Sequence, residues 1–174
     1  MSALLEMRGL LLEGITESNG SGKEGARRLG ISPTLLSLIG SGERALADDL
    51  KPKASAMSLK VGLAIIKEAT GYHKLFSFFT KDRHPANLYQ KVKKEDREAD
   101  TAYEDIADRL IDKPEDSDLT DDDIPFIQGR TCQIAHRMKA DMNYLVGLAE
   151  RYPSLKLEKL FTEKENICRE DRYV

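Results

Sequence analysis

Hydrophobic residues recur three and four positions apart along most of the chain, which is the spacing of one face of an α-helix. In the first 80 residues, glycines and short polar turns interrupt this pattern, which predicts five helices. We expect them to pack into one small all-α domain over residues 1–80. The expected helices cover residues 3–18, 23–29, 33–39, 59–70 and 72–79. The inner-face residues expected in the first, fourth and fifth helices are Leu4, Met7, Leu11, Ile15, Leu59, Gly62, Leu63, Ile66, Ala69, Leu75, Phe76 and Phe79.

The second and third of these helices have the local pattern of a helix-turn-helix. Ala26 is a small residue where the two helices would cross, and Gly30 suits the left-handed conformation that ends a helix. Ser32 is a favoured N-cap residue, and Pro33 follows it at the first helical position, where no backbone N–H is needed. The buried side is expected to comprise Leu29, Ile31, Leu36 and Ile39, which leaves Thr34, Ser37 and Leu38 facing outward.

The outward residues are candidates for DNA contact, because the start of the second helix of such a motif reaches base edges in the major groove. Short hydroxyl side chains read bases more weakly than Arg or Gln, so specificity would rest partly on DNA shape or on the spacing of two subunits. The expected base contacts are Ser32, Pro33, Thr34, Ser37 and Leu38, and the expected phosphate contacts are Lys23, Arg27, Arg28 and Arg44. Because similar helix pairs also occur in proteins that do not bind DNA, a purely structural role stays open.

Two polar stretches are expected to lack long regular structure. Residues 43–55 contain charged residues and a proline, and we favour a solvated loop there, although Lys51 and Lys53 also suit contact with a phosphate backbone. Residues 81–97 are expected to be a mostly basic linker, in which His84 and Pro85 break regular structure. Contact of Lys91, Lys93 and Lys94 with a phosphate backbone is an equal alternative for this stretch.

Residues 98–174 are expected to form a helical oligomerisation region. A helix of about 14 residues, with one apolar face, precedes a turn at 113–119 and a long helix that starts at Asp122 or Asp123. About 28 residues make a rod of about 40 Å, which the shorter helix cannot cover, so we expect a second subunit to bind there. The alternative is a hairpin within one chain that packs on the N-terminal domain. The expected seam comprises Ile124, Ile127, Thr131, Ile134, Met138, Asp141, Leu145, Leu148 and Tyr152, and its apolar members Ile124, Ile127, Ile134, Met138, Leu145 and Leu148 are the candidate oligomer contacts.

Composition supports a soluble helical protein with a nucleic-acid-binding front half. Of the 174 residues, 33% are charged, and residues 1–94 carry 15 Lys and Arg against 9 Asp and Glu, whereas residues 95–174 carry 12 against 21. A chance asymmetry is the alternative. No apolar run approaches the length of a membrane span, and the N-terminus lacks the features of a signal peptide. Cys132 and Cys168 form no CxxC pattern, which fits a reducing cytoplasm.

The sequence offers no support for catalysis, a metal or another cofactor. The GSGK run at 20–23 lacks the following Ser or Thr and the upstream Gly of a phosphate-binding loop. The acidic run at 116–127 lacks the Gly and the final Glu of a calcium loop. The histidines are isolated in sequence, so we expect a protein that is not an enzyme.

Residues 26–44 and 58–79 resemble the lambda-repressor-like DNA-binding fold. The resemblance lies in the Leu-Gly-Ile-Ser step, the Leu-Ser pair of the second helix of the motif and the closing Gly-Glu-Arg. The longer layout is similar to phage regulatory proteins of CII type from non-lambdoid temperate phages. The chain departs from the repressor-like pattern in two ways: its recognition helix lacks Gln and Arg, and the loop before the fourth helix is long.

This resemblance implies a transcription regulator in the cytoplasm of a bacterial host. It would bind double-stranded DNA as a dimer or tetramer and activate a lysogeny promoter through contact with RNA polymerase. The sequence does not separate activator from repressor. The alternative function is a helical protein–protein interaction module, such as an adaptor, an antirepressor or an antitoxin-like protein, in which the helix-turn-helix is only a scaffold.

Overall fold

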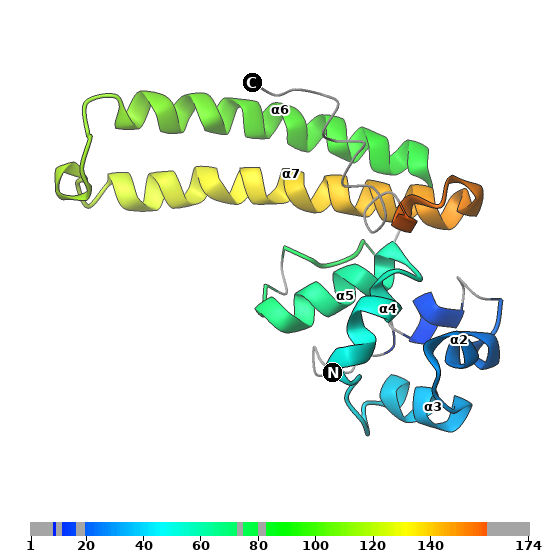
Figure 1. Cartoon of the computed structure of the whole chain (residues 1–174). Coiled ribbons are helices and arrows are strands. Elements are labelled where there is room, and N and C mark those ends of the chain that lie inside the picture. The colour runs from blue at the N-terminus through cyan, green and yellow to red at the C-terminus, as the bar shows by residue number, and fades with distance from the viewer. Residues whose placement is uncertain (1–8, 10–11, 17–19, 73–74, 80–82, 160–174) are drawn as a thin grey trace. The chain divides into compact units, whose positions relative to one another are not determined.

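The computed structural model describes residue 9 and residues 12–16, 20–72, 75–79 and 83–159, and every structural statement below concerns these residues. In this part of the chain, helices are joined by turns and no β-strand occurs (Figure 1), so the predicted all-α class is confirmed. The chain divides into two compact units. We call residues 1–76 with 148–174 the head unit and residues 77–147 the hairpin unit.

The head unit contains most of the predicted helices at the predicted places. Helices α2 (Gly22–Leu29), α3 (Pro33–Ser41) and α5 (Leu59–Thr70) lie within two residues of their expected bounds, so these three predictions are confirmed. Residues 12–16 are helical and fall inside the first expected helix. Its other expected inner residues, Leu4, Met7 and Leu11, lie outside the described residues. The remaining elements of the unit are η1 (Asp48–Leu50), α4 (Lys51–Ser55) and η3 (Pro153–Leu155).

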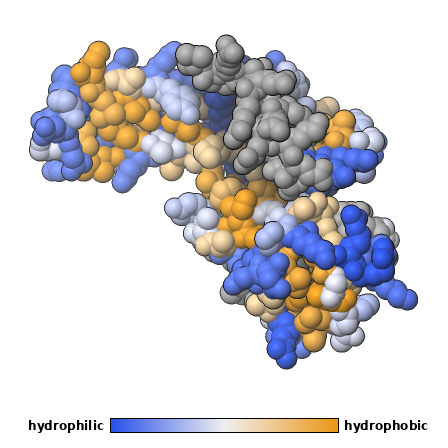
Figure 2. All heavy atoms as spheres, in the orientation of Figure 1, coloured by the Kyte–Doolittle hydropathy of each residue, from blue (hydrophilic) through white to orange (hydrophobic). Residues whose placement is uncertain are grey.

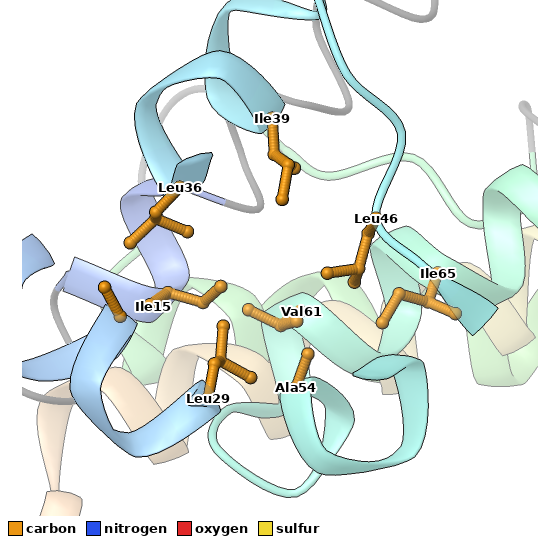
Figure 3. Close-up of a cluster of buried hydrophobic side chains, with 9 residues drawn as sticks. Ile15, Leu29, Leu36, Ile39, Leu46, Ala54, Val61 and Ile65 are labelled. Carbon is orange, nitrogen blue, oxygen red and sulfur yellow. The ribbon is translucent and has the colours of Figure 1, made fainter. Parts of the chain in front are cut away.

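One apolar cluster holds the head unit together. Side chains from separate helices and from the segment after α3 point toward one another in it (Figure 3). The helix over residues 12–16 and α3 approach closely at Gly40, where an added Cβ would lie 2.6 Å from Leu12 Cδ2. Burial of each large apolar side chain stabilises the fold by about 1.5–3 kcal/mol. The buried cluster comprises Ile15, Ala26, Leu29, Leu36, Ile39, Leu46, Ala54, Val61 and Ile65.

The predicted inner face of α5 is only partly right. Leu63 is buried as expected, but Ile66 is 42% exposed and Ala69 is exposed, whereas Val61 and Ile65 enter the core. Apolar residues occupy nearly every position from 61 to 66, so their spacing does not select one face. Nor does a hydrophobic pattern anticipate two buried lysines, Lys60 and Lys67. The ammonium of Lys60 is 3.0 Å from the carboxylate of Glu13, which compensates the cost of burying the charge.

Two further expectations about the head unit need correction. The stretch 43–55 is not simply a loop, because η1 and α4 lie in it and Pro52 occupies the first turn of α4, where proline is tolerated. The helix expected at 72–79 is wrong over the residues described there, which form a turn at 75–76 and no regular structure at 77–79. Gly71 ends α5 with φ of 71°, and the N–H of Phe79 donates to the side chain of Asn143, so it makes no helical bond.

The hairpin unit begins earlier than expected. Helix α6 (Pro85–Leu110) includes residues 85–97, so the predicted linker over 81–97 is wrong for this part. Pro85 starts the helix instead of breaking it, because a proline at the first position fits helical geometry. His84 caps it, with Nδ1 accepting a hydrogen bond from the N–H of Ala86 at 3.3 Å.

Helix α7 (Asp123–Arg151) starts where the sequence predicts and runs antiparallel to α6, with η2 (Asp116–Asp118) between them (Figure 1). Three ion pairs join the two helices: Asp123 with Arg109, Arg130 with Asp105, and Arg137 with Asp96. The residue numbers rise along α7 as they fall along α6, as expected of an antiparallel pair. Small residues allow this close packing, since an added Cβ at Gly147 would collide with Leu88. The small residues buried in the unit are Ala99, Ala102, Ala140 and Gly147.

The sequence predicted a second subunit because a helix of about 14 residues could not cover the long helix. This reason is wrong, since α6 has 26 residues and lies along the part of α7 that belongs to the hairpin unit. The seam expected along α7 is only partly buried. Ile124 and Met138 are 47% and 50% exposed. The other candidate oligomer contacts, Ile127, Ile134, Leu145 and Leu148, are partly buried. The residues that contact or pack on α6 are Asp123, Arg130, Arg137, Tyr144 and Gly147.

Candidate nucleic-acid interface

Local hydrogen bonds cap both ends of α2 and the start of α3. Ser21 caps α2, its Oγ accepting from the N–H of Glu24 at 3.1 Å. Gly30 ends α2 with φ of 81°, and its N–H donates to the carbonyl of Ala26 at 3.0 Å. Ser32 caps α3 by accepting from the N–H of Leu35 at 3.1 Å, and Pro33 takes the first helical position. The predicted turn and N-cap are therefore confirmed.

The inner side of the two helices is also nearly as predicted. Ala26 is 0% exposed, as expected of a small residue where two helices approach each other. Leu29, Leu36 and Ile39 are buried, whereas Ile31, in the turn, is only partly buried. Because these residues fix both helices to one core, the orientation of α3 relative to α2 is determined by packing.

The outer side of α3 carries hydroxyl groups and no charge. Thr34 and Ser37 are exposed, as are Ser32 and Pro33 at the start of the helix. The oxygen of Ser32 is used in the cap, which reduces its capacity to accept a hydrogen bond from a base. Leu38 is half-buried and not fully outward as expected, because a helical step of about 100° places it beside the buried Ile39.

The four cationic residues expected to contact phosphates are exposed. Lys23, Arg27 and Arg28 are exposed on α2, and Arg44 is exposed after α3. Arg27 is not fully available, because Nη2 and Nε lie 2.6 and 2.8 Å from the two carboxylate oxygens of Glu24. This hydrogen-bonded pair lowers the pKa of Glu24 and raises the pKa of Arg27. This pair could have been predicted from the sequence, because Glu24 and Arg27 are three residues apart on one helix.

Lys53 has a structural contact that sequence reasoning missed. It lies on α4, and its Nζ is 3.4 Å from the carbonyl oxygen of Leu29, at the C-terminal end of α2. A cation there is favoured by the unpaired carbonyls and the negative end of the helix dipole. Lys51 pairs with Asp48 at 2.7 Å. Both lysines lie on α4 and not in the solvated loop that we expected from the sequence. The contact of Lys53 with Leu29 joins residues 24 positions apart, so no local sequence pattern predicts it.

Two further observations bear on the class of site. Among the described residues, no three His, Cys, Asp or Glu side chains are close enough to hold a metal ion. None of the described helices has the combination of length and hydrophobicity needed to cross a membrane.

The features of the head unit that bear on function are the capped pair α2 and α3, the exposed hydroxyls of α3 and the exposed cations of α2 and of the segment after α3. The resemblance to the lambda-repressor-like fold and to the CII-type layout stays a prediction. In a comparison with known proteins, no family model, no curated protein and no solved structure matches this chain.

Proposed function

We propose that this chain is a sequence-specific DNA-binding transcription regulator that places α3 in the major groove. The observation that carries the proposal is the capped α2–Gly30–α3 segment, with Ala26 of α2 fully buried in the core and the start of α3 exposed. A helix held in this way presents its N-terminal residues, Thr34 and Ser37, outward on a rigid support.

Exposed cations of α2 and of the segment after α3 give this surface its affinity for a phosphate backbone. Lys23 at the start of α2, Arg28 near its end and Arg44 after α3 are exposed. Each phosphate contact releases condensed counterions, so binding weakens as salt rises. Arg27 contributes less than an unengaged arginine would, because a phosphate has to compete with the carboxylate of Glu24.

The finer part of the proposal follows from the family resemblance. The chain is a developmental regulator of a phage or prophage in the cytoplasm of its bacterial host, and it activates a lysogeny promoter through contact with RNA polymerase. It acts as a dimer or tetramer, because a single helix-turn-helix reads few base pairs, and two heads on one operator bind with a greater effective affinity.

The test is a titration of a labelled random-sequence duplex with the full chain, followed by fluorescence anisotropy. Between about 50 and 200 mM salt, the affinity should fall steeply, by at least tenfold. A triple variant, Lys23→Gln, Arg28→Gln and Arg44→Gln, should bind more weakly and with a smaller salt slope, by about 1 for each lost phosphate contact.

The matched control removes three exposed cations from α6 instead, Lys93→Gln, Lys94→Gln and Arg97→Gln. It has the same change in net charge and should bind like the wild type. Equal losses in the two triple variants, or no binding at low salt, would contradict the proposal.

The uncharged outer side of α3 favours one alternative, a helical protein–protein interaction module such as an adaptor, an antirepressor or an antitoxin-like protein. The sequence of α3, PTLLSLIGS, contains no Arg, Lys, Gln or Asn to form bidentate bonds with a base. In this case the head unit binds a protein and not DNA. The same titration distinguishes the two candidates, because the interaction module has no affinity for the duplex at either salt concentration.

A further inference from the structure

The outer side of α7 lacks ionised residues over a long stretch. Between residues 124 and 142, no exposed residue of α7 is an Asp, Glu, Lys or Arg. This stretch is about 27 Å long at 1.5 Å per residue, in a chain of which 33% is charged. The exposed residues are Ile124, Pro125, Gln128, Gly129, Thr131, Cys132, His136 and Met138.

Three of the four charged residues of this stretch are engaged elsewhere in the hairpin unit, and the fourth, Asp141, lies 3.9 Å from Arg137 on α7 itself, with its side chain 46% exposed. Arg130 pairs with Asp105 of α6 at 2.8 Å, and Arg137 pairs with Asp96 at 3.0 Å. The ammonium of Lys139 lies 5.2 Å from the centre of the Phe79 ring. The hairpin therefore has one neutral side, on α7. The exposed charged residues of α6 make a contrasting side, and they are Lys93, Lys94, Arg97, Asp100, Glu104 and Asp108.

Within the neutral side, residues repeat at the spacing of a helix-packing seam. The positions are four and three apart in alternation, as in a coiled coil. Thr131 behaves as an apolar residue at this surface, because its hydroxyl donates to the carbonyl of Ile127 at 2.8 Å. Figure 2 shows hydrophobic residues gathered on the hairpin in the half nearer to the loop between α6 and α7. The seam comprises Ile124, Gln128, Thr131, Ala135, Met138 and Met142.

We propose that a second copy of this chain covers this seam, with the two α7 helices antiparallel and related by a two-fold axis near residue 133. A neutral surface suits an equally neutral partner, because no charge has to leave water when the two meet. The α7 seam of a second copy has this property by symmetry. The inference deepens the oligomeric part of the proposed function and rests on that function for its purpose, which is to hold two heads on one operator.

Charge in the connecting loop selects the antiparallel orientation. Residues 111–122 contain six Asp and Glu residues and one Lys. In a parallel pair, the two acidic loops would lie side by side and repel each other. In an antiparallel pair, they lie at opposite ends.

The antiparallel register also matches residue sizes. It sets Ile124 against Met142 of the partner copy at each end of the seam, and small residues, Thr131 and Ala135, against each other beside the axis. The heads are then related by a two-fold axis, so the operator of the proposed regulator is an inverted repeat.

Cysteine crosslinking tests this register without any DNA. The starting variant carries Cys132→Ser and Cys168→Ser, and single cysteines are then introduced at two exposed seam positions as Gln128→Cys and Met138→Cys in chains of different tag length. After the two chains are mixed and mildly oxidised, the crosslink between Gln128→Cys and Met138→Cys chains should exceed either self-crosslink several-fold. A dominant Gln128→Cys self-crosslink indicates a parallel pair and overturns the proposal.

Sedimentation of the full chain gives an independent readout of the same surface. The wild type should sediment as a dimer or tetramer, and Met138→Glu should reduce its mass by half or more. Ala107→Glu, at an exposed position of α6, is the matched control and should leave the mass unchanged. Equal masses for wild type and Met138→Glu overturn the proposal.

Failure of this inference is distinguishable from failure of the proposed function. A chain that binds DNA with steep salt dependence but shows no such crosslink keeps the function and loses the α7 interface. A chain that crosslinks as predicted but ignores DNA keeps the interface and loses the function.

Discussion

The head unit and the hairpin unit are both helical over the described residues, but different forces hold them together. The head unit has an apolar core in which Ile15, Leu36 and Val61 meet from distant parts of the chain. The hairpin unit buries mostly small or polar residues between α6 and α7 and adds ion pairs such as Arg130 with Asp105. Apolar burial depends little on pH, whereas ion pairs depend on the protonation of their carboxylates. We therefore expect the hairpin unit to be the part that responds to pH.

The largest expected effect comes from the core of the head unit. Leu36→Ala removes a side chain that is 1% exposed, and it should lower the free energy of unfolding by about 2–5 kcal/mol. Denaturant unfolding followed by circular dichroism measures it. Leu155→Ala, at a position of the same unit that is 49% exposed, is the control and should have little effect. Similar losses in both variants would contradict the assignment of the core.

A smaller loss is expected from crowding the hairpin unit. Ala99 is 0% exposed on α6, so Ala99→Leu forces the two helices apart and should cost about 1–3 kcal/mol of unfolding free energy. Ala107→Leu makes the same change at an exposed position of α6 and should be nearly neutral. If Ala99→Leu is also neutral in denaturant unfolding, the helices do not pack through small residues.

Asp123 should make the hairpin unit sensitive to acid. Its carboxylate is 1% exposed and accepts hydrogen bonds at 2.8 Å from both the N–H and the hydroxyl of Thr120, and it pairs with Arg109. These contacts, those of Thr120 first, hold the pKa of Asp123 well below its usual range. A lowered folded-state pKa adds stability that is fully present above the unfolded value of about 3.9, and this stability is lost progressively as pH falls from there through the much lower folded-state pKa.

Asp123→Asn should therefore lower the melting temperature at about pH 7, and by less at about pH 3, where part of this stabilisation is already lost. Asp116→Asn, at an exposed position of the same connection, is the matched control and should change little. An equal loss at both pH values for Asp123→Asn would show that the charge of this residue does not stabilise the hairpin.

The smallest expected effect has the opposite sign. Partial burial raises the pKa of Asp141, the carboxylate of Asp96 raises it further, and Arg137 opposes both. A raised folded-state pKa means that the ionised form costs stability at neutral pH, and this cost disappears as pH falls through the pKa. Asp141→Asn should therefore raise the melting temperature slightly at about pH 7. A clear fall in the melting temperature there would contradict this sign.

Local signals made the candidate site predictable from the sequence. Ser32, Pro33 and Gly30 specify caps and a turn through their own backbone preferences, so the bounds of α2 and α3 follow without tertiary information. The same holds for Gly71 at the end of α5. The pair of Glu24 with Arg27 was also accessible, since it is a contact within one helix.

Contacts between distant segments were not predictable in this way. The bond from Lys53 to the carbonyl of Leu29 joins α4 to α2, which are separated in the chain by α3 and η1, and the charge of the buried Lys60 is compensated by Glu13. The proline at position 85 is compatible with a helix start as well as with a break, and only its context decides. On α7, ion-paired residues such as Arg130 and Arg137 contact α6, so a search for apolar spacing does not find these contacts.

The central claim is that the outer side of α3 contacts DNA, and one pair of variants tests it most directly. Ser37→Glu places a carboxylate on the exposed side of α3, whereas Ser117→Glu makes the same change in the exposed loop of the hairpin unit. Anisotropy titrations with a labelled duplex at low salt, on variants that unfold like the wild type, should show binding reduced at least tenfold for Ser37→Glu and unchanged for Ser117→Glu. Equal affinities for Ser37→Glu and wild type would remove α3 from the interface and contradict the account.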